Sequence, residues 1–252
     1  MSNTMVIDER FCGFPHVAIG GYVGGVLAKA IGSSAEVRFL KPVMIGRQLS
    51  LEQPDPGCVE LRDADNTLAE ATATKLDIEA PAALGLAEAQ AASDSYPGFE
   101  RHPFPGCFCC GPSRAEGDGL RIFPGPIPER NLVAAAWTPH ASVADADGTL
   151  GMEAVWSAVD CPAIWALIDT TPADSADQVV TGTLAVEVVK PLRSGEQYIV
   201  LGWPLGGNGH KLFAGAAVMS SRGDLHVLAK QTCVITDRGI PLGISVWPTL
   251  NA

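Results

Sequence analysis

The sequence predicts an α+β fold in which one order of elements, a helix followed by antiparallel strands, occurs twice. The first observation is an internal repeat. Segment 37–46 reappears as 186–195, with its lysine, proline and glycine each 149 residues further on. The second observation is that an apolar, helix-like run precedes each copy, at residues 20–31 and 152–168. Two ordered copies of a helix and a Lys-Pro strand indicate a duplicated unit.

A shorter match supports the duplication. Residues 68–72 resemble residues 228–232 at an offset of 160. The growth of the offset from 149 to 160 predicts an insertion of 11 residues in the second copy, which we place at the glycine-rich hairpin 203–210. The chain then divides into an N-terminal half at 1–78, a linker at 79–102 and a C-terminal half at 103–252.

The helix predicted at 20–31 carries an apolar stripe and four glycines. The stripe has the spacing of one helical face and is expected to lie on a sheet; it comprises Tyr22, Val23, Val26, Leu27, Ala30 and Ile31. Glycines stand at positions 20, 21, 24 and 25. Because a glycine inside a helix costs about 1 kcal/mol relative to alanine, four of them indicate close approach of another backbone or of a ligand.

Strands are predicted from β-branched residues, alternation and turn sequences such as Pro-Asp-Pro-Gly at 54–57. In the first half they are expected at 35–41, 47–53, 58–63 and 67–76. In the second half they are expected at 120–123 and 132–137 before the second helix, and at 179–190, 196–203, 211–220 and 225–236 after it. The alanine-rich part of the linker, 80–92, is expected to be helical.

Composition excludes several classes of protein. Of 252 residues, 47% are hydrophobic and 18% charged, which excludes disorder for most of the chain. A net charge of −11 argues against a nucleic-acid partner, because an acidic surface repels phosphates. No apolar run is long enough for a membrane span, and the N-terminus has neither the basic start nor the apolar core of a signal peptide. Seven cysteines, an odd number, predict reduced thiols and a cytoplasmic location.

Three segments resemble hotdog-fold thioesterases. Residues 16–28, with Gly20 and Gly21, resemble the Gly-Gly helix start of acyl-CoA thioesterases. Cys107-Phe108-Cys109-Cys110-Gly111 and the later Gly119-Leu120 resemble the Cys-Phe-x-Cys-Gly…Gly-Leu segment that opens many hotdog thioesterase domains. Residues 155–162 resemble the acid-bearing helix of the phenylacetate-pathway type.

The resemblance implies a double hotdog, that is, two tandem domains in which an antiparallel sheet wraps around a central helix. It implies an acyl-CoA substrate held between the two hotdogs. There an N–H at the start of one helix, near Gly20 or Gly21, polarises the thioester carbonyl, and a carboxylate on the other helix is base or nucleophile. It also implies a homodimer, because paired double hotdogs cover their sheet edges.

Asp160 is the predicted carboxylate. It shares a helical face with Trp156 and Ile164, four residues before and after it, and an acid on an apolar face is costly unless it has partners. Desolvation of such an acid favours its use as a base near neutral pH. The alternative is that Pro162 is the first residue of a helix and Asp160 only lies near its cap. The first helix carries no acid, so the sequence predicts one composite site for each chain.

Other candidates are weaker. His16 precedes the Gly-Gly pair by four residues, where a local loop role competes with a catalytic one. Tyr22 and Trp156 on the helices, and Lys41 and Lys190 at the repeated strand ends, are the candidates for substrate contact. Glu153 is a weaker candidate for the acid, with a helix-dipole role as the alternative, and His140 is expected to be a surface loop residue. Further candidates, as cations for coenzyme A, are Arg38, Arg193 and Arg222.

The cysteines suggest a metal site, but their spacing supplies too few ligands for one. Cys107, Cys109 and Cys110 lack a second cysteine pair, and only the scattered Cys12 and His102 could add ligands. We therefore expect no metal and no cofactor, and packing of small apolar thiols instead. Cys161, next to Asp160, is expected to be a buried structural thiol rather than a nucleophile.

Two functions from different classes follow. The leading hypothesis is an acyl-CoA thioesterase in which Asp160, or a water that it activates, attacks the thioester. The competing hypothesis is a hotdog protein that binds an acyl or aromatic ligand without turnover, which the missing His-Gly-Gly favours. A dehydratase is disfavoured because no His-Asp signature is present.

Overall fold

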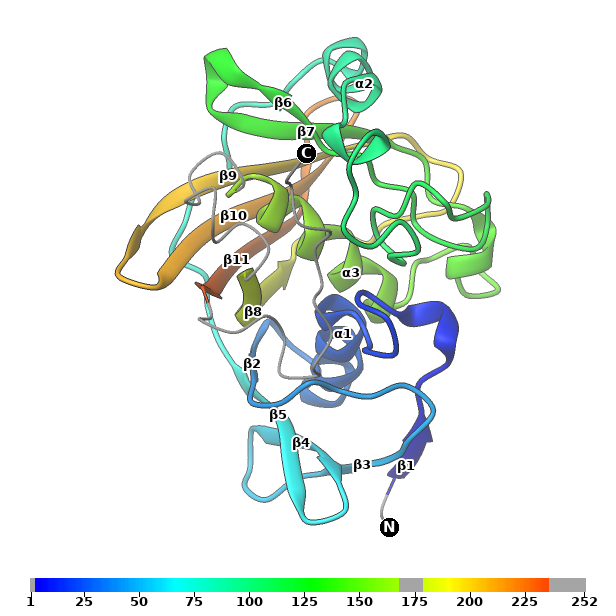
Figure 1. Cartoon of the computed structure of the whole chain (residues 1–252), viewed down its shortest axis with the longest axis vertical. Helices are drawn as coiled ribbons and strands as arrows, with labels where there is room; N and C mark the ends of the chain where they lie inside the picture. Colours follow the sequence, from blue (N-terminus) through cyan, green and yellow to red (C-terminus); the bar gives the residue numbers. More distant parts are fainter. Residues whose placement is uncertain (1–2, 168–178, 236–252) are drawn as a thin grey trace, which may run out of the picture.

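The computed structural model describes residues 3–167 and 179–235. Within them the strands form one antiparallel sheet in the order β1-β3-β4-β5-β2-β8-β11-β10-β9-β7-β6, and two helices, α1 and α3, lie side by side within its curve (Figure 1). No helix in these two segments is long and apolar enough to cross a bilayer.

The first half of the sheet surrounds α1 (Gly20–Ile31), whose bounds match the prediction. A left-handed Gly32, with φ of 74°, ends the helix, and its N–H bonds to the Ala28 carbonyl. The helix packs on β2, β4 and β5 through its apolar face. The strands are β1 (Asn3–Val6), β2 (Ala35–Phe39), β3 (Gln48–Glu52), β4 (Cys58–Asp63) and β5 (Asn66–Ala73).

The second half of the sheet surrounds α3 (Met152–Trp165). This helix is buried along most of its length against β9, β10 and β11. Pro162 lies inside the helix and not at its start, so the alternative in which Pro162 begins a helix is wrong. The strands are β6 (Gly125–Ile127), β7 (Leu132–Trp137), β8 (Val179–Val188), β9 (Tyr198–Asn208), β10 (Lys211–Ser220) and β11 (Leu225–Ile235).

The two halves join at the centre of the sheet and along the helices. Strand β2 pairs with β8, from Ala35 opposite Val186 to Arg38 opposite Thr183. On α1, a Cβ added at Gly21, Gly24 or Gly25 would collide with atoms of α3. The predicted close approach to these glycines is therefore made by the second helix.

A connecting segment leads from β5 to the second half. It contains α2 (Leu86–Asp94), which begins six residues later than the helix predicted at 80–92 and packs on β7 and β6. Four single-turn 3₁₀ helices complete the described structure: Glu9–Phe11, Pro97–Phe99, Pro128–Arg130 and Ala141–Val143.

The strand predicted at 120–123 is wrong. Arg121 has a left-handed φ of 54°, which breaks an extended run, and the N–H groups of Leu120 and Ile122 bond to the carbonyls of Phe108 and Cys109. The segment therefore packs on the cysteine loop instead of joining the sheet. Strands β1 and β6 were not predicted, because both are short and β6 contains Pro126. The predicted ends at Ile168 and Thr236 lie outside the described residues.

Candidate active site

Asp160 is a buried carboxylate at the contact between the two central helices. It is 2% exposed and lies on the face of α3 that meets the start of α1. The Gly21 N–H donates to its Oδ2 atom at 2.7 Å. Unpaired N–H groups at a helix start favour an anion, so the α1 terminus stabilises the carboxylate. The two predicted components of the site, 139 residues apart in the chain, are thus in direct contact.

Two strands of the second half add polar side chains to Asp160. On β11, the Gln231 side-chain amide donates to Asp160 Oδ1 at 2.8 Å and to Thr181 Oγ1 at 2.7 Å. On β8, the Thr181 hydroxyl donates to Asp160 Oδ1 at 3.3 Å. Gln231 is fully buried, and its Oε1 has no partner among the described residues. The three side chains form one hydrogen-bonded group.

With donors from the described residues, the carboxylate keeps one acceptor position open. A carboxylate has about four lone-pair sites, and Gly21, Gln231 and Thr181 fill three of them. Burial raises the pKa of the Asp160 carboxyl to about 6, while the hydrogen bond from the Gly21 N–H opposes the rise. A further donor can therefore reach this acid without displacing its partners.

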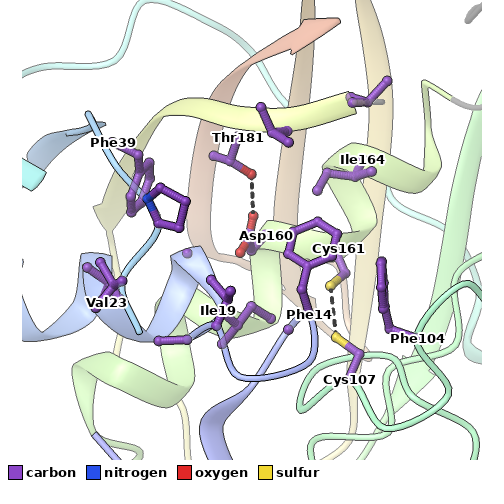
Figure 2. A pocket seen from close by; sticks show the side chains of 18 of the residues that line it. Phe14, Ile19, Val23, Phe39, Phe104, Cys107, Asp160, Cys161, Ile164 and Thr181 are labelled. Carbon is purple, nitrogen blue, oxygen red and sulfur yellow. Dashed lines mark hydrogen bonds between the residues drawn. The ribbon is translucent and has the colours of Figure 1, made fainter. Parts of the chain in front are cut away.

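An apolar cavity of about 330 Å³ lies over Asp160 and Thr181 (Figure 2). Gly20, at the start of α1, lines it, and no partner of the Gly20 N–H is found within residues 3–167 and 179–235. The walls are mostly large apolar side chains: Phe14, Val23, Phe39, Phe104, Ile164 and Trp165. This volume and lining suit an apolar small-molecule group, with the polar atoms gathered at one point.

Lys41 is the one predicted substrate contact that lines the cavity. Its ammonium donates to Asn66 Oδ1 and is exposed, so its charge lies at the cavity edge in water. Lys190, at the equivalent strand end, does not line this cavity and forms an ion pair with Asp224 at 3.1 Å. The structure therefore brings Lys41, but not Lys190, to this cavity.

His16, Tyr22 and Trp156 do not line the cavity either. His16 has a left-handed φ of 63° and is exposed, because the chain turns there to enter α1. Tyr22 stacks on Phe11 with ring centroids 4.0 Å apart. Trp156 is fully buried and fills the space beside Gly24, so its role is in the core.

Two further sequence candidates have structural partners. Glu153, on the first turn of α3, lies 3.6 Å from Lys29 at the far end of α1. His140 is exposed, and its Nδ1 atom accepts from the Ser142 N–H in a turn. His140 therefore has the loop role that the sequence predicted, and Glu153 has an ion-pair partner on the other central helix.

Thr181 and Gln231 were missed by sequence reasoning. Gln231 offered a signal, since it stands between Ala229 and Cys233 on the inward face of β11, where a polar residue needs partners. Thr181 offered none, because threonine is an ordinary strand residue.

Cysteine side chains meet beside the cavity. Cys161 Sγ lies 3.7 Å from Cys107 Sγ, and these two sulfurs and that of Cys110 lie within 4.8 Å of one another. Sequence spacing could not bring Cys161 into this group, because it lies on α3, far along the chain from the other two. None of the seven cysteines forms a disulfide.

Solved structures resemble the whole chain. A protein from Alicyclobacillus acidocaldarius described as having a hot dog fold superposes with a TM-score of 0.50 at 13% identity, over 93% of each chain. The chain has the hotdog fold. A protein from Novosphingobium aromaticivorans assigned as a thioesterase gives a TM-score of 0.63 at 11% identity, over 92% of this chain and 94% of that one. An acyl-CoA thioesterase II, TesB2, from Mycobacterium marinum gives 0.54 at 15% identity, over 89% and 91%.

Sequence comparison finds no relative of this hotdog protein. No protein-family model matches the chain. No curated protein matches it either.

Proposed function

We propose that this hotdog protein is an acyl-CoA thioesterase with one composite site between the two halves of the chain. The observation that carries the proposal is the group of Asp160, Thr181 and Gln231, set at the base of an apolar cavity beside the start of α1. A buried acid with an open acceptor position suits general-base catalysis. The hydrolase TesB2, which has the same fold, is named an acyl-CoA thioesterase, and this supports the substrate class.

Water is the proposed nucleophile. Both carboxylate oxygens of Asp160 already accept hydrogen bonds, which disfavours direct attack by the carboxylate. A water bound to the open position of Asp160 and to Thr181 Oγ1 would reach a thioester in the cavity, which both residues line. Gln231 lies behind them, does not line the cavity, and is a positioning residue.

The reaction is balanced within the site. Asp160 takes a proton from the water while the water oxygen bonds to the carbonyl carbon. The resulting oxyanion is stabilised by the N–H of Gly20, since the Gly21 N–H already bonds to Asp160. The carbon–sulfur bond then breaks, and the protonated acid returns its proton to the leaving thiolate. The products are a carboxylic acid and coenzyme A.

The two central helices support a single site for each chain. Asp160 is the ninth residue of α3, and the ninth residue of α1 is Ala28, which is buried and carries no acid. Strand pairing gives the same asymmetry. Gln231 pairs with Leu184 in the second half, and at the equivalent place in the first half Ala73 pairs with Ala35. The site on the other side of the helix pair therefore lacks the acid and the amide.

We propose that the halves arose by tandem duplication into a double hotdog. In the first half the Lys41 N–H bonds to the Leu68 carbonyl, and in the second the Lys190 N–H bonds to the His226 carbonyl. Gly46 and Gly195 both have left-handed φ, of 72° and 78°. The two lysines are 149 residues apart, which is the predicted offset. The two carbonyl partners, Leu68 and His226, are 158 residues apart. The second match in the sequence is thus displaced by two residues from the structural one.

A binding protein without turnover is the second candidate. The engagement of the Gly21 N–H with Asp160 favours it, because a single predicted donor, that of Gly20, is left for an oxyanion. Measuring thiol release from a panel of aliphatic and aromatic acyl-CoAs separates the two. Binding of acyl-CoA with no thiol release above the uncatalysed rate would exclude the thioesterase.

A further inference from the structure

Three buried sulfurs from two distant segments meet in one cluster. Cys107 and Cys110 belong to the loop before β6, and Cys161 belongs to α3. Their exposed fractions are 4%, 2% and 8%, and their sulfurs all lie within 4.8 Å of one another. Figure 2 shows Cys107 and Cys161 facing each other at the edge of the cavity, with their sulfurs 3.7 Å apart.

The sulfur separation excludes a disulfide and is compatible with a metal site. A disulfide needs about 2.05 Å between sulfurs. Two thiolates on one tetrahedral Zn²⁺, with Zn–S bonds of about 2.3 Å, lie about 3.8 Å apart. The separation of 3.7 Å between Cys107 and Cys161 matches the second value.

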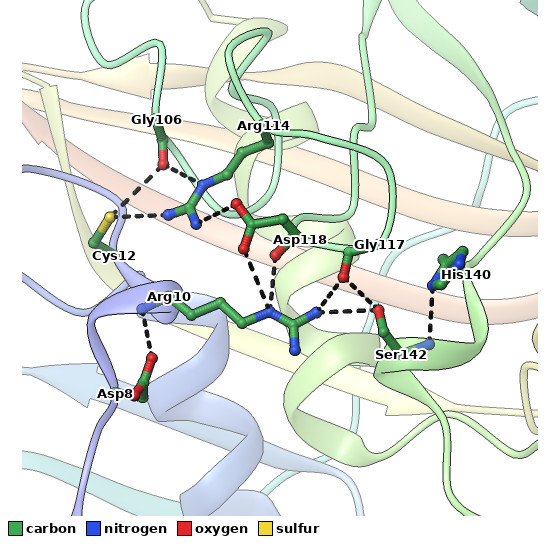
Figure 3. A network of polar contacts seen from close by, with 9 residues as sticks. All are labelled: Asp8, Arg10, Cys12, Gly106, Arg114, Gly117, Asp118, His140 and Ser142. Atoms are coloured by element: carbon green, nitrogen blue, oxygen red, sulfur yellow. Dashed lines mark hydrogen bonds and ion pairs between the residues drawn. The ribbon is translucent and has the colours of Figure 1, made fainter.

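The loop that carries Cys107 and Cys110 holds both sulfurs toward one point. Two residues separate the cysteines, which is the spacing of a zinc-binding pair, and the Gly111 N–H bonds to the Cys107 carbonyl at 2.9 Å. A Cβ at Gly111 would collide with the Pro105 carbonyl, so the turn requires glycine. Figure 3 shows Arg114 fixing the same loop by donating to the Gly106 carbonyl, at 2.7 Å.

His102 supplies a hydrogen-bond donor to the cluster. Its Nε2 atom lies 3.2 Å from Cys110 Sγ, and its Nδ1 atom accepts from the Phe104 N–H at 2.8 Å. The accepting role of Nδ1 places the proton of a neutral ring on Nε2, which points to the sulfur. Such outer donors stabilise thiolate ligands and orient them.

We propose that Cys107, Cys110 and Cys161 bind a zinc ion, with His102 as a hydrogen-bond donor to Cys110 and a water from the cavity as the fourth ligand. Thiolates favour this soft divalent ion. Cys107 and Cys161 line the cavity, which gives the water its access. The ion would tie the loop to α3 one residue from Asp160. The proposal departs from the expectation of no metal, because the fold adds the third sulfur that sequence spacing lacked, and it does not depend on thioesterase activity.

Metal content tests the proposal directly. The full chain, without a polyhistidine tag and purified in reductant without chelator, is expected to contain about one zinc per chain by elemental mass spectrometry. Cys110→Ser and Cys161→Ser are expected to lose it. Cys109→Ser is the matched control, since Cys109 is buried in the same loop and contacts the Cys161 thiol without being one of the three cluster sulfurs, and it is expected to keep the zinc. Replacing His102 with phenylalanine is expected to weaken zinc binding by about 10–100-fold without abolishing it.

A second measurement keeps the test valid if a variant fails to fold. Wild-type protein stripped of metal is titrated with Zn²⁺, and the melting temperature is expected to rise with zinc concentration, because the ion binds the folded state. Cobalt in place of zinc is expected to give thiolate-to-metal charge-transfer absorption. The proposal would be overturned if the protein contains no zinc and its melting temperature does not change when zinc is added. It would also be overturned if Cys109→Ser loses as much zinc as Cys110→Ser and Cys161→Ser. If the His102 variant loses zinc as completely as the cysteine variants, the assignment of His102 as an outer donor is wrong.

Discussion

Replacing Asp160 by asparagine tests the proposed chemistry most sharply. The change keeps the side-chain volume and removes the base, so acyl-CoA hydrolysis is expected to fall by about 10²–10⁴-fold. That loss corresponds to about 3–5 kcal/mol of transition-state stabilisation. The measurement is kcat/KM from thiol release, with the acyl-CoA that the wild type hydrolyses fastest.

The structure predicts that this variant folds. Four hydrogen bonds join Asp160, Gly21, Thr181 and Gln231. An asparagine can keep its oxygen toward the Gly21 N–H if the Gln231 amide turns over. Gln231 Oε1, which has no partner within residues 3–167 and 179–235, can then accept from the new NH₂ group. Three bonds then remain, and the free energy of unfolding is expected to fall by only about 1 kcal/mol.

Glu153→Gln is the matched control on the same helix. Glu153 pairs with Lys29 outside the cavity, so its loss is expected to leave kcat/KM within about 3-fold of wild type, as for a surface ion pair. Metal content of both variants is measured alongside, because Cys161 adjoins Asp160. An Asp160→Asn protein that is folded and retains more than about a tenth of the activity would refute the role of this acid as the base.

Four other outcomes are expected. Thr181→Val keeps the shape of the residue but removes a water ligand, and is expected to lower kcat by about 10–100-fold in the thiol-release assay. Gly21→Ala places a Cβ against the Ser157 backbone and is expected to lower the free energy of unfolding by about 1–3 kcal/mol in urea, whereas Gly85→Ala, with open space around it, is expected to change it by less than 1 kcal/mol, about the effect of a helix cap. Phe39→Ala is expected to shift kcat/KM toward longer or bulkier acyl groups, and an unchanged profile across the panel would remove Phe39 from the acyl-binding wall. Sedimentation is expected to show a homodimer, and a species at the single-chain mass of 26.3 kDa would contradict it.

A cytoplasmic location is also proposed. Seven cysteines without a disulfide, five of them buried, suit a reducing compartment. Fractionation of cells that express the full chain would test it, and recovery with secreted or membrane material would contradict it.

Local patterns predicted the elements well where one physical cause dominates. The predicted bounds of α1 and β4 match, because an apolar stripe marks the helix and alternation marks the strand. Those of β10 match because turns lie on both sides of it. The strand at 120–123 failed because apolar residues there serve a loop that bonds to Phe108 and Cys109, which no local pattern distinguishes from a strand. Strand β6 was missed because its three residues include a proline.

Part of the site was accessible to the sequence. Asp160 and the Gly20-Gly21 helix start could be identified because an acid on an apolar face and a glycine-rich helix each carry a known cost. Tyr22 and Trp156 lie on the same helices but point elsewhere, since helical spacing does not say which face meets the other helix. Lys41 and Lys190 were equivalent in the repeat, yet the cavity opens beside only the first.

The sequence by itself determined the two helix-and-strand units, the acid and the glycines that let the helices approach, because these depend on periodicity and on the cost of single residues. Only the tertiary structure decided which side chains surround Asp160 and which sulfurs meet. Gln231 reaches Asp160 across 71 residues, Thr181 across 21, and Cys161 joins Cys107 across 54. The pairing of strands and the packing of helices bring such partners together. The separation of two residues along the chain predicts neither.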